Sequence, residues 1–163
     1  MRTILHDLNK KDIKKLKFNT DDIIINSCEC KNSCIGCFSC WIKTPTKCIL
    51  NDNFNNMVNY LKSSTDFIII SKNRYGCYSE NIKRVLERCI GYVLPHFTIR
   101  NNEIHHKLRY NDNLNFITCF YGDINKNDKT CLNKLVKANS INLGAKNYRI
   151  FYNLKEIKNV YFN

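Results

Sequence analysis

The chain has 163 residues, of which 44% are hydrophobic, and this length and composition fit one globular domain over residues 1–163. No apolar run approaches the ~20 residues that a transmembrane helix needs, and Arg2 and Asp7 bring charge before a signal-peptide core forms. We therefore expect a cytoplasmic protein with no membrane partner. The net charge of +12 comes from scattered lysines, which indicates a basic solvated surface and disfavours a nucleic acid partner.

Hydrophobic patterning predicts alternating strands and helices. The Ile-Ile-Ile runs within 22–26 and 66–71 are typical of strands buried on both faces of a parallel sheet. Ser79 is a candidate N-cap, with Glu80 in the first helical turn. The expected strands are at 3–6, 22–26, 66–71, 115–121 and 148–152. The expected helices, which alternate with these strands, are at 9–18, at 51–63, from Ser79 to Cys89, and at 128–143, where Gly144 ends the last one. Residues 154–163 are not assigned.

Residues 92–110 interrupt the alternation. Two apolar segments flank Asn101-Asn102, which predicts an inserted β-hairpin. An exposed apolar hairpin needs a partner, so we expect it to form part of the contact in a homodimer or higher homo-oligomer. His105 and His106 are neighbours on one strand and are expected to point to opposite faces, so a structural or surface role is favoured over metal binding.

Strand–helix alternation on this scale predicts an α/β fold, namely a flavodoxin-like three-layer open parallel sheet. Five strands in the order 2-1-3-4-5 are expected, with the hairpin inserted around 92–110 and right-handed crossovers. Ligands of such sheets bind at the carboxyl ends of the strands.

The chain contains ten cysteines, six of them between Cys28 and Cys48. A reducing cytoplasm keeps thiols free, so this density favours metal or redox chemistry over a disulfide framework. The compact triple spacing is nearer to iron–sulfur ligation than to zinc, although zinc, thiol exchange and a loop that binds nothing stay open. The candidate metal ligands, spaced C-x2-C-x2-C-x7-C, are Cys34, Cys37, Cys40 and Cys48.

Several stretches resemble the flavodoxin-like family of NAD(P)H-dependent FMN reductases and iron–sulfur flavoproteins, over about residues 22–143. The cysteine loop with Trp41, Cys48 and Asp52 is the most specific part, and 66–88 is similar to the family's third strand, flavin-contacting loop and following helix. The resemblance implies FMN, a flavin-linked oxidoreductase activity with NAD(P)H or a small redox partner, a dimer and, in the iron–sulfur branch, a [4Fe-4S] cluster on the four cysteines. No catalytic acid–base residue can be named.

The resemblance also implies where the flavin lies. Tyr75 and Tyr78 are candidates to stack on its ring, or to pack at a subunit interface, and Arg74 could face a phosphate or a flavin carbonyl. Lys72 and Arg74 stand where the family tends to have Pro and Tyr. The residues implied in cofactor binding are Asn73, Arg74, Tyr75, Gly76, Cys77, Tyr78, Ser79, Gly122 and Asp123.

The stretch after the first strand departs from the family. Family members grip the FMN phosphate with a Ser/Thr/Gly/Asn-rich loop, whereas residues 7–12 contain no Gly, Ser or Thr and carry the carboxylates Asp7 and Asp12. The usual phosphate site is therefore expected to be missing. Two alternatives stay open: a binding module that has lost FMN and keeps a thiolate metal site, and a thiol redox sensor whose cysteines cycle to disulfides.

Overall fold

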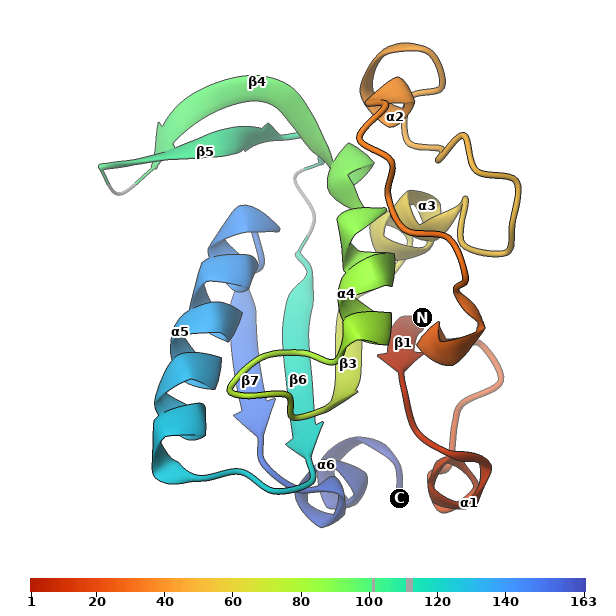
Figure 1. Cartoon of the computed structure of the whole chain (residues 1–163), viewed down its shortest axis with the longest axis vertical. Coiled ribbons are helices and arrows are strands. Elements are labelled where there is room, and N and C mark those ends of the chain that lie inside the picture. The colour runs from red at the N-terminus through yellow and green to blue at the C-terminus, as the bar shows by residue number, and fades with distance from the viewer. Residues whose placement is uncertain (101, 111–112) are drawn as a thin grey trace.

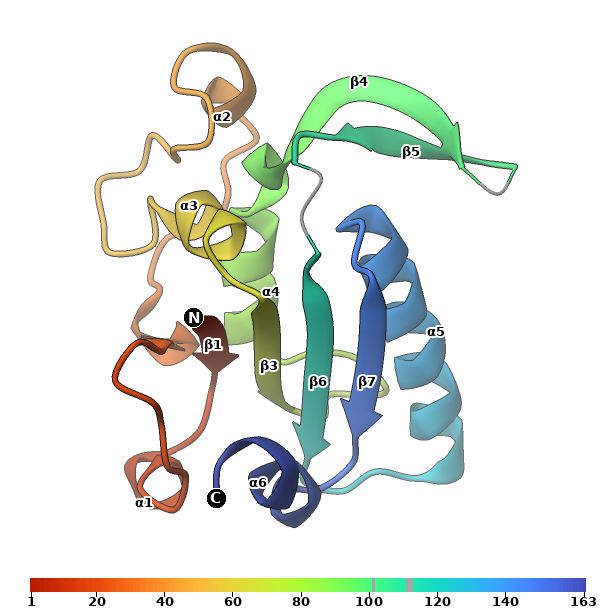
Figure 2. The same cartoon turned by 180° about the vertical axis from the view of Figure 1, so that it is seen from behind.

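A five-stranded parallel sheet forms the centre of the computed structural model, which describes residues 1–100, 102–110 and 113–163. Its strand order is β2-β1-β3-β6-β7. Helices α4 and α5 cover one face, and α1 and α6 lie on the other (Figure 1, Figure 2). The strands of this sheet are β1 (Arg2–His6), β2 (Ile23–Asn26), β3 (Asp66–Lys72), β6 (Asn115–Tyr121) and β7 (Asn147–Phe151).

The predicted hairpin is confirmed as a separate two-stranded antiparallel sheet, β4 (Val93–Arg100) and β5 (Glu103–Leu108). It follows α4 and projects over one end of α5 (Figure 1). Because its strands do not join the main sheet, the fourth and fifth strands of the parallel sheet are β6 and β7. Asn101 of the predicted turn lies outside the described residues. The predicted homo-oligomer contact of this hairpin stays a prediction.

The central strands bury both faces, as the isoleucine run at 66–71 predicts. On β3, Phe67 and Ile69 enter the core shared with α4 and α5, whereas Ile68 and Ile70 enter the core beneath α6. All four side chains are fully buried. The alternation of side chains along a strand therefore builds two cores from one apolar run.

The second isoleucine run is different, because β2 is an edge strand. Ile24 is 44% exposed, so the prediction that 22–26 is buried on both faces is wrong. The helix expected at 9–18 shrinks to α1 (Lys10–Ile13), and the one expected at 51–63 begins only at α3 (Met57–Lys62). Neither can cover the outer face of the edge strand along its length.

Side-chain caps fix where the longer helices begin. Ser79 caps α4 (Glu80–Glu87) as predicted, with its Oγ accepting from the backbone N–H of Ile82 at 3.4 Å. Asn125 and Asp128 form a capping box that starts α5 (Lys126–Asn142) two residues earlier than predicted. Asn153 caps α6 (Leu154–Tyr161), a helix within the unassigned tail.

Three short elements complete the assignment: η1 (Ser27–Glu29), α2 (Ser39–Ile42) and η2 (Ile90–Tyr92). Among the described residues, no helix combines the length and the apolar character that a bilayer crossing requires.

Candidate functional site

The residues singled out in the sequence lie at two opposite ends of the sheet (Figure 1). Residues 73–79 and 122–123 follow the carboxyl ends of β3 and β6. The cysteine loop instead packs beside η2, which follows the end of α4 near the amino ends of the strands. There, an added Cβ at Gly91 would lie 3.2 Å from Cys40 Cβ, and Trp41 Nε1 donates to the Ile90 and Val93 carbonyls at 3.1 and 2.9 Å. Within one chain, the cysteine loop and the residues at the carboxyl ends of the strands therefore do not form one site.

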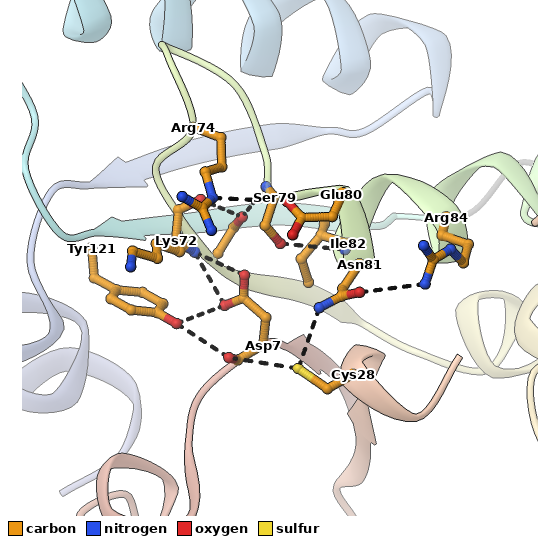
Figure 3. A network of polar contacts seen from close by, with 11 residues as sticks. Asp7, Cys28, Lys72, Arg74, Ser79, Glu80, Asn81, Ile82, Arg84 and Tyr121 are labelled. Atoms are coloured by element: carbon orange, nitrogen blue, oxygen red, sulfur yellow. Dashed lines mark hydrogen bonds and ion pairs between the residues drawn. The ribbon is translucent and has the colours of Figure 1, made fainter. Parts of the chain in front are cut away.

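At the carboxyl end of the sheet, Asp7 is the centre of a polar network (Figure 3). Its carboxylate accepts from the Lys72 backbone N–H at 3.0 and 3.1 Å and from the Tyr121 hydroxyl at 3.0 Å. Burial and the negative charge of Asp7 raise the pKa of Tyr121, so the phenol stays a donor. The Asp7 carboxylate thus links the carboxyl ends of β1, β3 and β6 through hydrogen bonds.

The first loop offers little to a phosphate. The backbone N–H groups of Lys11 and Asp12, at the start of α1, both donate to Asn9 Oδ1 at 2.9 Å. With these amides occupied and the Asp7 carboxylate nearby, a phosphate here would meet repulsion instead of an amide cradle. The predicted loss of the usual phosphate site agrees with this geometry. Lys10 and Lys11 remain exposed on α1 as sources of positive charge.

The loop after β3 presents one aromatic ring to solvent. Arg74 and Cys77 exchange two backbone hydrogen bonds of 3.0 and 3.1 Å, which close a tight turn over Tyr75 and Gly76. Both central residues have positive φ, 54° and 73°. Tyr75 is 97% exposed, so its ring is free to contact a ligand. A Cβ on Gly76 would lie 2.7 Å from Cys131 Cβ, so the turn sits directly on α5.

Asn73 holds this turn in place. Its Nδ2 donates to the Asp123 carbonyl at 2.7 Å and to Asp128 Oδ2 at 3.0 Å, and its Oδ1 accepts from the Gly76 N–H at 3.0 Å. Gly122, with φ of 92°, makes the bend that brings the Asp123 carbonyl there. Asn73, Gly76, Gly122 and Asp123 are therefore gathered at one point, as the resemblance implies.

Tyr78 and Ser79, in the same loop, have structural roles here. Tyr78 is 2% exposed, its ring stacks on Phe120 at 5.3 Å, and its hydroxyl accepts from Asn139 Nδ2 at 3.3 Å. Its ring is therefore not available to stack on a flavin. Ser79 caps α4, and its backbone N–H donates to Ser71 Oγ at 2.9 Å. Cys77 is half-buried, and Arg74 pairs at 3.8 Å with Glu80 on the surface.

At the other end of the sheet, the four candidate metal ligands line one small cavity of about 40 Å³. Burial and the neighbouring thiols of the other three raise the pKa of Cys40. As the side chains stand, the described residues include no group of three or more His, Cys, Asp or Glu placed to hold a metal ion. Four thiols around one cavity nevertheless suit a soft metal, provided that the loop tightens to bring the sulfurs together.

Local geometry holds the cysteine loop against the body. Gly36 and Phe38 both have positive φ, 65° and 53°, and α2 begins directly after them. Phe38 stacks on Trp41 with centroids 5.1 Å apart, and Trp41 is anchored at η2 through its two carbonyl contacts. The loop is exposed at Cys34 and Cys37 and half-buried at Cys40 and Cys48.

One charged residue of this cavity, Arg88, and its partner Asp52 are absent from the residues predicted as metal ligands. Arg88 lines the cavity with its side chain fully buried, and Asp52 binds it through two hydrogen bonds of 2.6 and 2.7 Å. The hydrogen bond from Arg88 is the largest cause that lowers the pKa of Asp52 to about 2. In the sequence, the signal that could have singled out Arg88 is a charged residue directly before Cys89, which continues the apolar stripe of the helix predicted there.

A larger cavity of about 750 Å³ adjoins the cysteine cavity and lies beneath the hairpin. Its lining is mostly apolar, and Cys34, Phe38 and Ile90 line both cavities. Both histidines of β5 border it. His105 Nδ1 lies 3.0 Å from Asn142 Oδ1, and His106 Nδ1 lies 2.9 Å from the Leu94 carbonyl, contacts that agree with the structural role predicted for them.

Comparison with protein-family models gives no match, and no curated protein matches the chain. Solved structures do share its fold. An FMN-dependent NADH-azoreductase from Bacillus anthracis, in complex with FMN, has a TM-score of 0.54 and 14% identity, over 91% of this chain and 84% of that chain. An NADH:FMN oxidoreductase in its apo form has a TM-score of 0.56 and 8% identity, over 99% and 79%. The flavodoxin-like α/β fold is thus shared with oxidoreductases that use FMN.

Proposed function

We propose that this chain is a flavodoxin-like redox protein, an FMN-linked NAD(P)H oxidoreductase. The observation that carries the proposal is the fold match, over 91% and 99% of this chain, with two NADH oxidoreductases whose names include FMN. The exposed ring of Tyr75, on a turn held at the carboxyl ends of β3 and β6, supports it, since aromatic faces pack well on a planar ring.

The chain's own residues supply different parts of such a site. Bound FMN supplies the hydride and electron chemistry. Tyr75 offers an aromatic face, and Gly122 lets the backbone come close to a ring. Because Asp7 and Asn9 occupy the amides near the first loop, the phosphate depends on the side-chain charge of Lys10 and Lys11. Binding should therefore be weaker and more salt-sensitive than in an amide cradle.

Titration of FMN into the purified protein, followed by flavin fluorescence, tests this proposal. We expect binding that weakens with added salt, weakens in Tyr75→Ala and strengthens in Asp7→Asn, which removes a repelling charge. Tyr148→Ala, which removes a ring from β7, serves as the matched control and should leave binding unchanged. If the protein binds no flavin even at low salt, the proposal is wrong, and the alternative of a binding module that has lost FMN is favoured.

A thiolate metal centre is a second candidate function, and the shared cavity of the four cysteines favours it. Anaerobic reconstitution with iron and sulfide, and separately with Zn²⁺ or Co²⁺, decides between a cluster, a single ion and a free-thiol redox sensor. We expect one centre per chain that is lost in Cys48→Ser and kept in Cys131→Ser, an exposed cysteine on α5. Reversible loss of thiols without metal uptake supports the sensor instead.

A further inference from the structure

We infer that Arg88 is the charge partner of the sulfur centre, a positioning residue held by Asp52 that donates hydrogen bonds into the cavity of the four cysteines. The inference rests on the thiolate centre proposed above and deepens it. It adds to the cysteines a residue from a distant part of the chain.

The contacts of the guanidinium carry the inference. Arg88 lines the cavity together with all four cysteines, and its Nη1 also lies 3.7 Å from the Sγ of Cys30, a buried cysteine that is not part of the cavity lining. The Arg88 side chain is fully buried, and Asp52 is the carboxylate that balances its charge. Its buried Nε has no hydrogen-bond partner among the described residues. One donor of this buried cation is therefore left without an acceptor, in a side chain that lines the cysteine cavity.

The remaining contacts fix the guanidinium plane. Asp52 takes both Nη atoms in a bidentate pair, and the Phe54 ring centroid lies 5.9 Å from Cζ. Both Nη atoms are therefore occupied, and Nε is the donor left for a further acceptor. Arginine suits the position better than lysine, because its planar fork can serve a carboxylate and a sulfur at once.

The charge of a thiolate centre explains what Arg88 would stabilise. Four thiolates around one divalent ion leave a net negative charge in a partly buried cavity, which costs free energy unless cations or N–H donors lie close. Hydrogen bonds to ligand sulfurs are known to tune metal affinity and reduction potential. Arg88 offers both a charge and a donor at this point.

The test measures Co²⁺ binding by its thiolate charge-transfer absorption, and Zn²⁺ binding by competition, in the full-length protein. We expect Arg88→Gln to weaken binding roughly 10–100-fold. Arg84→Gln is the matched control, because it removes the same charge one turn earlier on α4, from a side chain that is not part of the cavity lining. It should change binding less than twofold.

Asp52→Asn separates a charge role from a merely structural one. It removes the competing negative charge, while the asparagine Oδ1 can still accept a hydrogen bond that holds the guanidinium in place. We therefore expect binding at least as tight as in the wild type and a higher reduction potential for a reconstituted cluster. If Arg88 served only the fold, Arg88→Gln and Asp52→Asn would weaken binding alike. Where circular dichroism shows Arg88→Gln unfolded, weaker binding in folded Asp52→Asn still overturns the inference.

The outcomes separate the two proposals. If the wild-type protein takes up neither Co²⁺ nor Zn²⁺, the thiolate centre fails and the inference fails with it. If the wild type binds metal and Arg88→Gln binds it equally well, the centre stands and the inference alone is overturned.

Discussion

Asp52→Asn should destabilise the fold by removing the partner of a buried cation. Asp52 accepts from Arg88 at 2.6 and 2.7 Å, from Asn32 at 3.0 Å and from the Phe54 backbone N–H at 3.0 Å. These contacts join the end of the cysteine loop to α4. The asparagine keeps the shape but not the charge, so it leaves the Arg88 guanidinium buried without its counter-ion.

The lowered pKa of Asp52 gives the size of the expected loss of stability. A pKa of about 2 instead of the ordinary 3.8 corresponds to about 2.4 kcal/mol of stabilisation of the charged form. The Asp52 side chain is 21% exposed, and solvent screens the pair, so we expect ~1–2 kcal/mol of lost stability. For a chain of 163 residues this lowers the Tm by roughly 2–8 °C.

The pH dependence provides the sharper check. Because the folded-state pKa of Asp52 is lowered, its contribution is fully present above about pH 4 and is lost as the pH falls toward 2. Urea unfolding of both proteins from pH 7 to pH 2 should show two stabilities that converge at the acid end. The control Asp21→Asn, at a surface pair with the N-terminus, should change stability by less than ~0.5 kcal/mol. Equal stabilities at pH 7, or a gap that persists at pH 2, would refute the reasoning.

Three further changes test other parts of the molecule. Gly76→Ala should lower the free energy of unfolding by ~1–3 kcal/mol, because the φ of this residue is +73° and the new Cβ would lie 2.7 Å from Cys131 Cβ. An unchanged urea midpoint of unfolding would contradict the turn geometry. Trp41→Phe should lower the free energy of unfolding by ~1–3 kcal/mol, because it leaves two backbone carbonyls without their indole donor. Unfolding followed by circular dichroism measures this loss of stability. Ile99 and Ile104 are 74% and 75% exposed on the hairpin, and replacing both with lysine should convert an oligomer to a monomer in size-exclusion chromatography. If the wild-type protein is already a monomer at micromolar concentration, the predicted oligomer is wrong.

Local chemistry made the central elements predictable. The apolar run at 66–71 gave a buried strand because its neighbours on both sides are also strands, and Ser79 capped its helix as its side chain predicts. The same reasoning failed at 22–26, because periodicity does not reveal whether a strand is central or at an edge. It also misjudged Tyr78, because the sequence of a loop does not reveal whether an aromatic side chain faces solvent or, as here, packs on Phe120.

The separation of the two sites follows from the way parallel strands are connected. A connection between two parallel strands of one sheet starts at the carboxyl end of the first and must finish at the amino end of the second. The position of a motif along the connection therefore decides the end of the sheet at which it lies. Residues 27–65 form such a connection from β2 to β3, and the cysteines sit beyond its first turn, where the chain already packs against η2 (Figure 1). Residues 73–79 are the first residues of the next connection and therefore stay at the carboxyl ends. A flavin on Tyr75 and a sulfur centre beside Arg88 would then lie on opposite ends of one sheet, so direct electron transfer between them within one chain is disfavoured, and each centre needs its own partner.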